Sequence, residues 1–537
     1  MNWLFLTQNK TLAVFFEVMQ ALRAKEPQGT TGFYLSDAEF FHNFAQATPA
    51  LTGGDYVLLK EWEILARAAQ TVPDLPRLRA YEEKLGDPVL WNALVADRRI
   101  YLGRTATLVQ DYPSRFRQDR MLAILQVAVE EMERLFDRVR PDAVVGFICV
   151  TIGDYLAYLV AKSRRIPFFN LRPTRIRNFF HAGESVLEPS RRLEEVFREL
   201  LREGVPPDLR NEASAYLGQV RQSHAMYEGV IPAQPAGGAP VVKASSNSVL
   251  GRALRPVRNA AARWAVHRTP EFRHDTSYPG VVYPLWVKAM MPLKKRALAR
   301  TLGSRYVTAA QLAGLEYVFF PLHKEPEVTL LVYSRPYMNQ IEVIRNLARS
   351  LPVGMALVVK EHPAGLGYHP AGYYRKLLAI PGVVLVPPET KSRDLIEKAR
   401  LIAIISGSIG LEALMMKKPV LHFGRIPFSI LPETMIRRVA DPDRLAWDVK
   451  EMLTHHRHDE QALLAYVAAT MQTSVPIDFY SILLERSGVY RPSAGADETD
   501  PRARNIHRLA DYLWRLCGAA RGEETGPLLQ ATPGNLA

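Results

Sequence analysis

The sequence predicts an α/β protein with two doubly wound, Rossmann-like domains facing each other across a cleft, a basic helical insertion and a partly disordered C-terminal tail. Three observations predict this fold. The chain of 537 residues is too long for a single hydrophobic core. Short apolar runs typical of buried strands alternate with helical patterns in both halves. A segment rich in Pro, Ala and Gly at 231–240 separates the two halves.

These observations also predict the domain boundaries. Residues 1–230 form the first domain, 231–312 the linker and basic helical region, 313–490 the second domain, and 491–537 a flexible tail with one short helix at 505–517. The first residues lack a basic region ahead of their apolar residues, so we expect no signal peptide. No segment approaches the roughly 18 uncharged apolar residues of a membrane-spanning helix.

The first half shows a strand–helix–strand pattern at its start and again before residue 170. Residues 56–140 and 188–227 have mostly helical patterns with many charged residues. We expect strands at 2–7, 32–36, 143–150 and 166–170, and helices at 12–23, 118–138 and 151–163.

The second half is more regular, because apolar runs and helical patterns follow each other in strict alternation. Such alternation is typical of a parallel sheet covered by helices. We expect strands at 317–322, 356–361, 383–386, 401–405 and 419–423, and helices at 338–350, 371–379, 392–398, 410–416 and 444–453.

The net charge of +13 is concentrated in residues 241–305, which hold thirteen Lys and Arg against two acidic residues. Several prolines are expected to break this stretch into short pieces. A solvated linker surface is one interpretation. A second is attachment to anionic lipid headgroups, since basic residues alternate there with Trp264, Leu285, Trp286, Met290 and Met291. Nucleic-acid binding is the third and least favoured, because no nucleic-acid-binding motif is present.

Two cysteines, Cys149 and Cys517, are too few for a disulfide framework and indicate a reducing compartment. We therefore expect a cytoplasmic protein, which the lipid interpretation of the basic stretch would place on the inner face of the membrane.

Three polar motifs follow strands of the second domain. FPLHKEPE at 320–327 follows the first strand, VKEHP at 359–363 the second, and SGSIGLE at 406–412 the fourth. The carboxyl ends of parallel strands meet at the edge where doubly wound sheets bind ligands, and a helix that starts there presents N–H groups to an anion. The candidate nucleotide-binding residues are His323, Lys360, Glu361, Pro363, Ser406, Gly407, Ser408, Gly410 and Glu412, with His362 as a candidate catalytic residue.

Each motif also has a structural explanation. His362 could simply close a loop before Pro363, and His323 could be a hydrogen-bonded structural histidine. The loop at 406–408 could be a tight turn with a capping serine. Glu412 follows Ser408 by one helical turn, so it either completes a capping box or accepts hydrogen bonds from a ribose.

In this order and spacing, the three motifs resemble the capsule polysaccharide biosynthesis family, over roughly residues 317–428. The resemblance implies a two-domain GT-B fold and a transferase using a nucleotide sugar such as CMP-Kdo. It places the family's His-Pro pair on His362 and Pro363, and its small-residue loop on residues 406–408. It also implies that these elements and Glu412 contact the nucleotide phosphate and the cytidine ribose. One departure is Lys417-Lys418, where the family usually has Gly-Lys.

The first domain is expected to supply the acceptor side and the catalytic carboxylate. Asp37 and Asp154 follow strands there, although each could merely cap a helix. Arg172 and Arg175 could bind an acidic acceptor sugar or a lipid phosphate. The pair Asp441 and Asp443 precedes a helix and is expected to cap it, so we expect neither a metal nor a cofactor.

These observations predict a metal-independent glycosyltransferase acting on a growing or lipid-linked surface polysaccharide. The leaving nucleotide gains negative charge, which loop N–H groups, serine hydroxyls and His362 would stabilise. An epimerase or hydrolase of the same fold is an alternative, and a non-catalytic polysaccharide-assembly partner is another.

Overall fold

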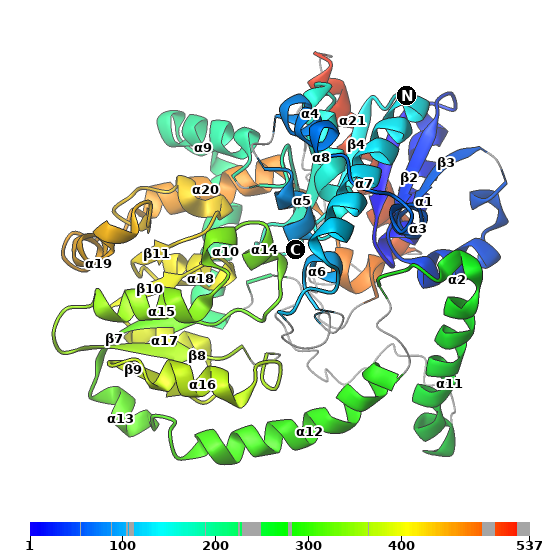
Figure 1. Ribbon diagram of the computed structural model, residues 1–537. Helices are drawn as coiled ribbons and strands as arrows, with labels where there is room; N and C mark the ends of the chain where they lie inside the picture. Colours follow the sequence, from blue (N-terminus) through cyan, green and yellow to red (C-terminus); the bar gives the residue numbers. More distant parts are fainter. Residues whose placement is uncertain are drawn as a thin grey trace.

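The computed structural model describes residues 1–53, 55–86, 89–103, 106, 112–187, 189–223, 226–227, 249–277, 282–362, 365–485 and 500–522. Two sheets, each covered by helices, form two lobes (Figure 1). Both sheets have a parallel core, so the expected α/β architecture of two Rossmann-like domains, which is GT-B-like, is confirmed. Within the described residues, no helix has the length and apolar character needed to cross a bilayer.

The first sheet has seven strands in the order β13-β6-β5-β4-β1-β2-β3. The five strands from β5 to β3 are parallel, while β6 and β13 are antiparallel additions at one edge. The central strands consist of buried apolar residues, as parallel strands covered on both faces require. The strands are β1 Trp3–Thr7, β2 Thr31–Leu35, β3 Tyr56–Lys60, β4 Ala143–Phe147, β5 Phe168–Pro173, β6 Phe179–Gly183 and β13 Val475–Pro476.

Helices cover both faces of this sheet. One core forms under α7 and α8, and another under α1 and the C-terminal helix α21. The helices from this part of the chain are α1 Thr11–Lys25, α2 Ala38–Ala47, α3 Glu61–Ala68, α4 Leu75–Leu85, α5 Trp91–Ala96, α6 Arg98–Tyr101, α7 Gln118–Val139, α8 Ile152–Ser163, α9 Arg191–Glu203 and α10 Pro207–Ser223.

Three strands of this sheet were not predicted: β3, β6 and the two-residue β13. β3 lies in the segment expected to be mostly helical, and it is a partly exposed edge strand whose apolar run is only four residues long. β6 is a short buried strand that pairs antiparallel with β5. The interpretation of residues 56–140 as mostly helical is therefore wrong at β3, because tertiary pairing decides the state of so short a segment.

The second sheet is entirely parallel, with the order β12-β11-β10-β7-β8-β9. All five strands predicted for this half are present, and only β12 was not predicted. The strands are β7 Glu316–Pro321, β8 Met355–Lys360, β9 Val383–Val386, β10 Leu401–Ile404, β11 Val420–His422 and β12 Ile436–Arg438.

The predicted helices between these strands are also present. α15, α16 and α19 contribute to the core on one face of the sheet, and α17 and α18 to the core on the other. The helices of this half are α13 Ala309–Ala313, α14 Val328–Leu331, α15 Gln340–Arg349, α16 Ala371–Leu378, α17 Ser392–Lys398, α18 Ser408–Met415, α19 Leu445–Thr454 and α20 Glu460–Thr473.

Several helices pack away from the domain expected from their place in the chain. α9 and α10 pack against α20 and share a core with α18, although residues 1–230 were predicted to form the first domain. α21 spans Pro501–Ala520, longer than the predicted 505–517, and packs on α1 of the first lobe (Figure 1). Its buried side chains include Leu509, Leu513 and Cys517. The helix is thus part of the first lobe's core.

The basic region forms two long helices, α11 Val249–Arg268 and α12 Val282–Gly303. The prediction that prolines break it into short pieces is wrong, since Pro292 lies inside α12. A proline removes one backbone hydrogen bond, and the rest of a helix can still form around it. The predicted linker at 231–240, the tail at 491–499 and the last residues from 523 lie outside the described residues.

Candidate functional site

The three polar motifs of the second lobe lie at the carboxyl ends of neighbouring strands. The sheet order places β7 between β10 and β8, and each of these strands runs directly into one motif. The motif at 320–327 is therefore central, with the loop at 406–408 on one side and residues 359–362 on the other. Pro363 lies outside the described residues.

His323 connects two of these motifs. The backbone N–H of Ser406 donates to His323 Nε2 over 3.3 Å. The side chain of the fully buried Gln340 accepts from the His323 N–H and donates to its carbonyl oxygen, which holds the backbone of this residue in place. Because Nε2 accepts a hydrogen bond, the neutral ring carries its proton on Nδ1, the nitrogen that lies 3.8 Å from Glu327 Oε2.

A carboxylate and two histidines share this edge of the sheet. Burial raises the pKa of Glu327, but His323, Thr329 and His362 outweigh it, so that this pKa is lowered and the group is anionic. Burial lowers the pKa of His362, and the opposing effect of Glu327 is smaller. His362 is therefore a neutral imidazole near pH 7, and its side chain is exposed.

Gly407 gives the 406–408 loop its shape. Its φ of +104° and ψ of 173° fall in a region that glycine alone adopts readily. A Cβ atom at this position would lie 3.2 Å from His323 Cε1. α18 begins at the next residue, Ser408, whose hydroxyl is 3.4 Å from the hydroxyl of Tyr227. The backbone of the loop therefore contacts His323, and the N-terminus of α18 lies at the same edge of the second sheet.

Replacing Gly407 with alanine is expected to destabilise the protein by roughly 1–3 kcal/mol and to weaken nucleotide binding. The added methyl group would push against His323 and disturb its contact with Ser406. Gly382→Ala is the matched control, because Gly382 has a φ of +79° but nothing within 4 Å of its Cβ position. Urea unfolding and nucleotide titration of both variants test this. Equal nucleotide affinities in the two variants would contradict the role of the loop.

Lys360 ends β8 and Glu412 lies in α18, and the two side chains interact electrostatically. Lys360 Nζ donates to Ser392 Oγ over 3.3 Å, and burial lowers the pKa of this lysine against the opposing effects of Glu361, Glu389 and Glu412. Burial raises the pKa of Glu412, which Arg393 and Lys360 oppose. The proposed capping box between Glu412 and Ser408 is absent, since the N-cap residue is Gly407 and no side chain caps the helix. The Glu412 carboxyl group therefore has no capping role.

Glu361 and Gly410 have structural roles in this lobe. Glu361 accepts from the Tyr374 hydroxyl over 2.7 Å, lies 3.7 Å from His369 Nε2, and burial raises its pKa to about 7. Successive residues of a strand face opposite sides of a sheet, so Glu361 cannot share the side of Lys360. A Cβ atom on Gly410 would lie 2.4 Å from Ile404 Cδ1, which makes close packing of α18 on β10 the reason for this glycine.

Lys417, the departure from the family's usual Gly-Lys pair, has a φ of +60°. This left-handed conformation directly after α18 favours glycine, which explains the usual residue of the family. The departure affects the end of the helix, opposite to the loop.

In the first lobe, both candidate carboxylates cap helices. Asp154 is buried at the start of α8, where its Oδ2 accepts from Gln8 Nε2 at 2.5 Å and from the N–H groups of Val150 and Thr151 at 3.0 and 2.9 Å. Asp37 caps α2 by accepting from the Phe40 N–H over 2.8 Å. Burial raises the pKa of each carboxyl to about 6. Of the two, only Asp37 is partly exposed.

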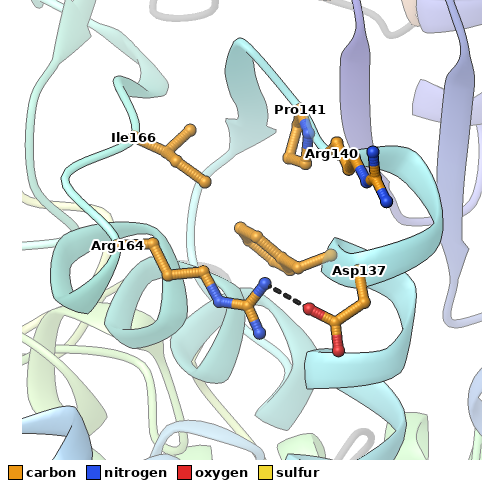
Figure 2. Close-up of a pocket in the computed structure, with 6 residues that line it drawn as sticks. Asp137, Arg140, Pro141, Arg164 and Ile166 are labelled. Carbon is orange, nitrogen blue, oxygen red and sulfur yellow. Dashed lines mark hydrogen bonds and ion pairs between the residues drawn. The ribbon is translucent and has the colours of Figure 1, made fainter.

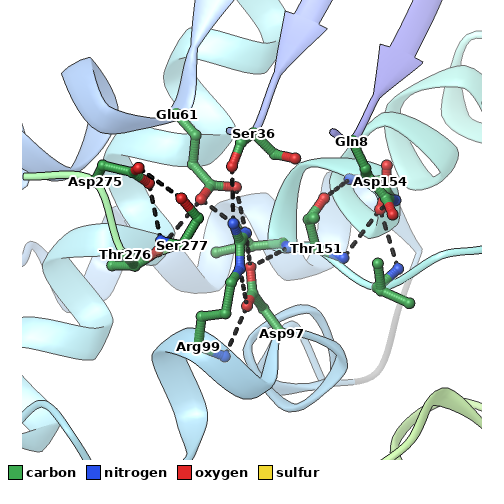
Figure 3. A network of polar contacts seen from close by, with 12 residues as sticks. Gln8, Ser36, Glu61, Asp97, Arg99, Thr151, Asp154, Asp275, Thr276 and Ser277 are labelled. Atoms are coloured by element: carbon green, nitrogen blue, oxygen red, sulfur yellow. Dashed lines mark hydrogen bonds and ion pairs between the residues drawn. The ribbon is translucent and has the colours of Figure 1, made fainter. Parts of the chain in front are cut away.

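A buried charge network that was not predicted lies beside them (Figure 3). Arg99 Nη2 lies 2.7 Å from Glu61 Oε1 and 2.6 Å from Asp97 Oδ2, and Arg99 Nη1 donates to the Ser36 carbonyl over 2.9 Å. Burial raises the pKa of Glu61 to about 8 despite the guanidinium. Glu61 starts α3, whereas Asp97 and Arg99 lie together at the start of α6, so no local pattern reveals the link between these two segments.

α6 links this network to the motif at 320–327. Arg98, next to Arg99, donates from Nη1 to the carbonyl oxygen of Pro326 over 3.1 Å. Apolar contacts between Leu331 and the first-lobe residues Val95 and Leu102 support the same junction. The first lobe therefore contacts the motif that contains His323.

The two candidate acceptor arginines also lie at the junction of the lobes. The guanidinium of Arg172 lies 5.0 Å from the ring centroid of Tyr333 and donates to the Ser185 carbonyl over 2.5 Å. The guanidinium of Arg175 lies 4.8 Å from the ring centroid of Tyr227, the residue that contacts Ser408. The structure thus places Arg175 beside the 406–408 loop and Arg172 beside the segment that follows α14.

A surface cavity of about 430 Å³ lies elsewhere, near the starts of β4 and β5 in the first sheet (Figure 2). Its lining includes the ion pair between Arg164 and Asp137, at 2.6 Å, and residues near the start of β4. None of the motif residues lines it. Among the described residues, no three His, Cys, Asp or Glu side chains gather as possible metal ligands, and Asp441 caps a short helix by accepting from the Asp443 N–H.

Comparison with known proteins agrees with the motif resemblance. A family model described as "Capsule polysaccharide biosynthesis protein" matches residues 257–472, which confirms that resemblance. No curated protein matches the chain.

Among solved structures, the chain is similar to Thermosulfurimonas dismutans KpsC, beta Kdo 2,4 transferase, at 15% identity, over 62% of this chain and 79% of that chain, with a TM-score of 0.33. It is also similar to Thermosulfurimonas dismutans KpsC, beta Kdo 2,7 transferase, at 11% identity, over 65% of this chain and 82% of that chain, with a TM-score of 0.32. A third similar structure is UDP-GlcNAc 2-epimerase from Neisseria meningitidis, at 11% identity, over 88% of this chain and 98% of that chain, with a TM-score of 0.24. Scores this low do not establish a shared function.

Proposed function

We propose that this chain is a glycosyltransferase, because a family model described as "Capsule polysaccharide biosynthesis protein" matches residues 257–472. It moves a sugar from a nucleotide-sugar donor, CMP-Kdo or a similar compound, to a growing or lipid-linked surface polysaccharide. The observation that supports this most directly is the convergence of His323, His362 and the 406–408 loop at three adjacent strand ends.

The donor nucleotide binds at this edge of the second sheet. Its phosphate faces the start of α18, where backbone N–H groups and the hydroxyls of Ser406 and Ser408 stabilise negative charge. His362 donates a hydrogen bond to the phosphate as the bond to the sugar breaks. Glu412 accepts hydrogen bonds from the ribose, and Lys360 adds positive charge next to it. No metal is required for this step, because these groups supply the charge stabilisation.

The acceptor binds on the side of the first lobe. Asp37 is the better candidate for the catalytic carboxylate, because it is partly exposed and, with a pKa of about 6, is anionic at neutral pH. Asp154 is the weaker candidate, because it is buried and its Oδ2 already accepts three hydrogen bonds. Arg172 binds an acidic group of the acceptor, whereas Arg175 acts close to the donor phosphate through its position beside Tyr227.

A thermal-shift screen against CMP, UDP and GDP tests the donor site. A nucleotide at 100 times its dissociation constant adds about 2.7 kcal/mol to the free energy of unfolding. We expect CMP to raise the melting temperature most, and the Gly407→Ala variant to lose most of this increase while Gly382→Ala keeps it. The absence of a shift with all three nucleotides would contradict the proposal and would favour a non-catalytic assembly partner.

Incubation with a nucleotide sugar alone separates the transferase from an epimerase or hydrolase of the same fold. A transferase leaves the donor largely intact until an acceptor is added, whereas the alternatives convert it at their full rate. We place the reaction in the cytoplasm, at the inner face of the membrane where a lipid-linked acceptor is reached.

A further inference from the structure

The outer face of α12 carries an unusual group of exposed apolar side chains. Trp286, Met290 and Leu293 are 54%, 39% and 54% exposed, respectively. Their spacing of four and three residues places them on one side of the helix, one above the other. We call these three residues the α12 stripe. Large apolar residues that are exposed singly are common, but three adjacent ones on one helix face mark an interaction surface.

The opposite face of α12 packs on the second lobe. Leu298 and Leu302 are buried in the core that contains α15 and α16. Met291 contacts the loop at Gly367, where an added Cβ would lie 2.6 Å from the sulfur atom. The helix is thus anchored along its inner face, and Figure 1 shows it running along one side of the molecule. The stripe faces away from this anchor.

The charged side chains of α11 and α12 are all basic. α11 and α12 contain ten Lys and Arg and no Asp or Glu. Arg296 and Arg300 follow the stripe and are exposed, and no described carboxylate forms an ion pair with either of them. A helix with exposed Trp, Met and Leu next to uncompensated cations has the composition of an interfacial helix on anionic lipid.

We propose that α12 docks this protein on an anionic lipid bilayer, with the α12 stripe inserted among the lipid headgroups and Arg296 and Arg300 bound to their phosphates. The anchored inner face holds the second lobe at the membrane in a defined orientation. The inference goes beyond the proposed transfer reaction and does not depend on it, because lipid binding requires neither donor nor acceptor.

A fluorescent probe on the stripe tests this directly in the full-length chain. The native cysteines, Cys149 and Cys517, are buried, so an environment-sensitive thiol probe should label a new surface cysteine selectively. We expect the probe on Leu293→Cys to shift to the blue when vesicles containing phosphatidylglycerol are added. The probe on Val353→Cys, a fully exposed position in a loop, is the matched control and should not shift. A blue shift at position 293 without vesicles would indicate a second copy of the chain and overturn the proposal.

Vesicle co-sedimentation separates the contribution of the two arginines to lipid binding from that of the α12 stripe. Each basic residue near an anionic surface contributes roughly fivefold to binding, so Arg296→Gln with Arg300→Gln should weaken it roughly 25-fold. The same change at the exposed Arg198 and Arg202 of α9 should have little effect. Serine at all three stripe positions should weaken binding roughly tenfold or more.

Nucleotide-induced stabilisation should be unchanged in all these variants, which separates this test from that of the donor site. Binding that is equal with neutral phosphatidylcholine vesicles, or equal for the α9 and α12 variants, would overturn the proposal.

Discussion

Replacing His362 with alanine is expected to lower kcat for sugar transfer roughly 100- to 1,000-fold. The imidazole is the group we assign to the leaving phosphate, and removing one donor from such a site has an effect of this size. The side chain is exposed, so the free energy of unfolding should change little. Steady-state kinetics with a nucleotide sugar and an oligosaccharide acceptor, together with urea unfolding, measure both quantities.

His455→Ala is the control for this variant. His455 is an exposed histidine of the same lobe, paired with Glu451 at the end of α19 and distant in sequence from the three motifs. It should retain full activity. Full activity of His362→Ala as well would refute the assignment of this histidine to the reaction.

Replacing Arg99 with alanine is expected to lower the free energy of unfolding by about 3–5 kcal/mol. The change leaves Glu61 and Asp97, which are 2% and 0% exposed, buried without their cation. A second substitution, Glu61→Gln, should restore part of this loss because it removes one of the two buried charges. Denaturant unfolding of the single and double variants measures the difference.

The decrease in the free energy of unfolding caused by Arg99→Ala should also depend on pH. The pKa of Glu61 is already raised in the folded protein, and loss of the guanidinium raises it further. A folded-state pKa above the unfolded value means that folding takes up a proton. The stability of Arg99→Ala should therefore be highest at acidic pH and fall as pH rises toward 8 and above.

Arg164→Ala is the matched control for Arg99→Ala. Its ion pair with Asp137, at 2.6 Å, is open to solvent on the side of Asp137, which is 66% exposed, while Arg164 is 28% exposed (Figure 2). Solvent screens such a pair, so the expected loss is below about 1 kcal/mol and nearly independent of pH. Equal losses for Arg99→Ala and Arg164→Ala would contradict the importance of the buried network.

The sequence predicted the second lobe well, because its strands are buried on both faces and appear as continuous apolar runs. β7, β8 and β10 begin and end within about two residues of the expected positions. Parallel pairing then brings the motifs that follow these strands to one edge. The predictions for His323 and the 406–408 loop as neighbours follow from this rule, and the Ser406–His323 contact agrees with it.

Lys360 and Glu361, which were both predicted for the nucleotide site, have different side-chain partners. Side chains alternate along a strand, so Lys360 and Glu361 must face opposite sides of the sheet. Lys360 faces Ser392 and Glu412, whereas Glu361 faces Tyr374 of α16. The assignment of Glu361 to the nucleotide site stays a prediction.

The sequence alone therefore determined the α/β class, the order of the second lobe's elements and the edge on which the three polar motifs meet, because these depend on local patterns and on the geometry of parallel strands. Only the tertiary structure decided what depends on contacts between distant segments. Arg99 meets Glu61 across 38 residues, and α21 packs on α1 from the other end of the chain. The energy that selects these partners comes from burial in the folded core, and no short stretch of sequence carries it.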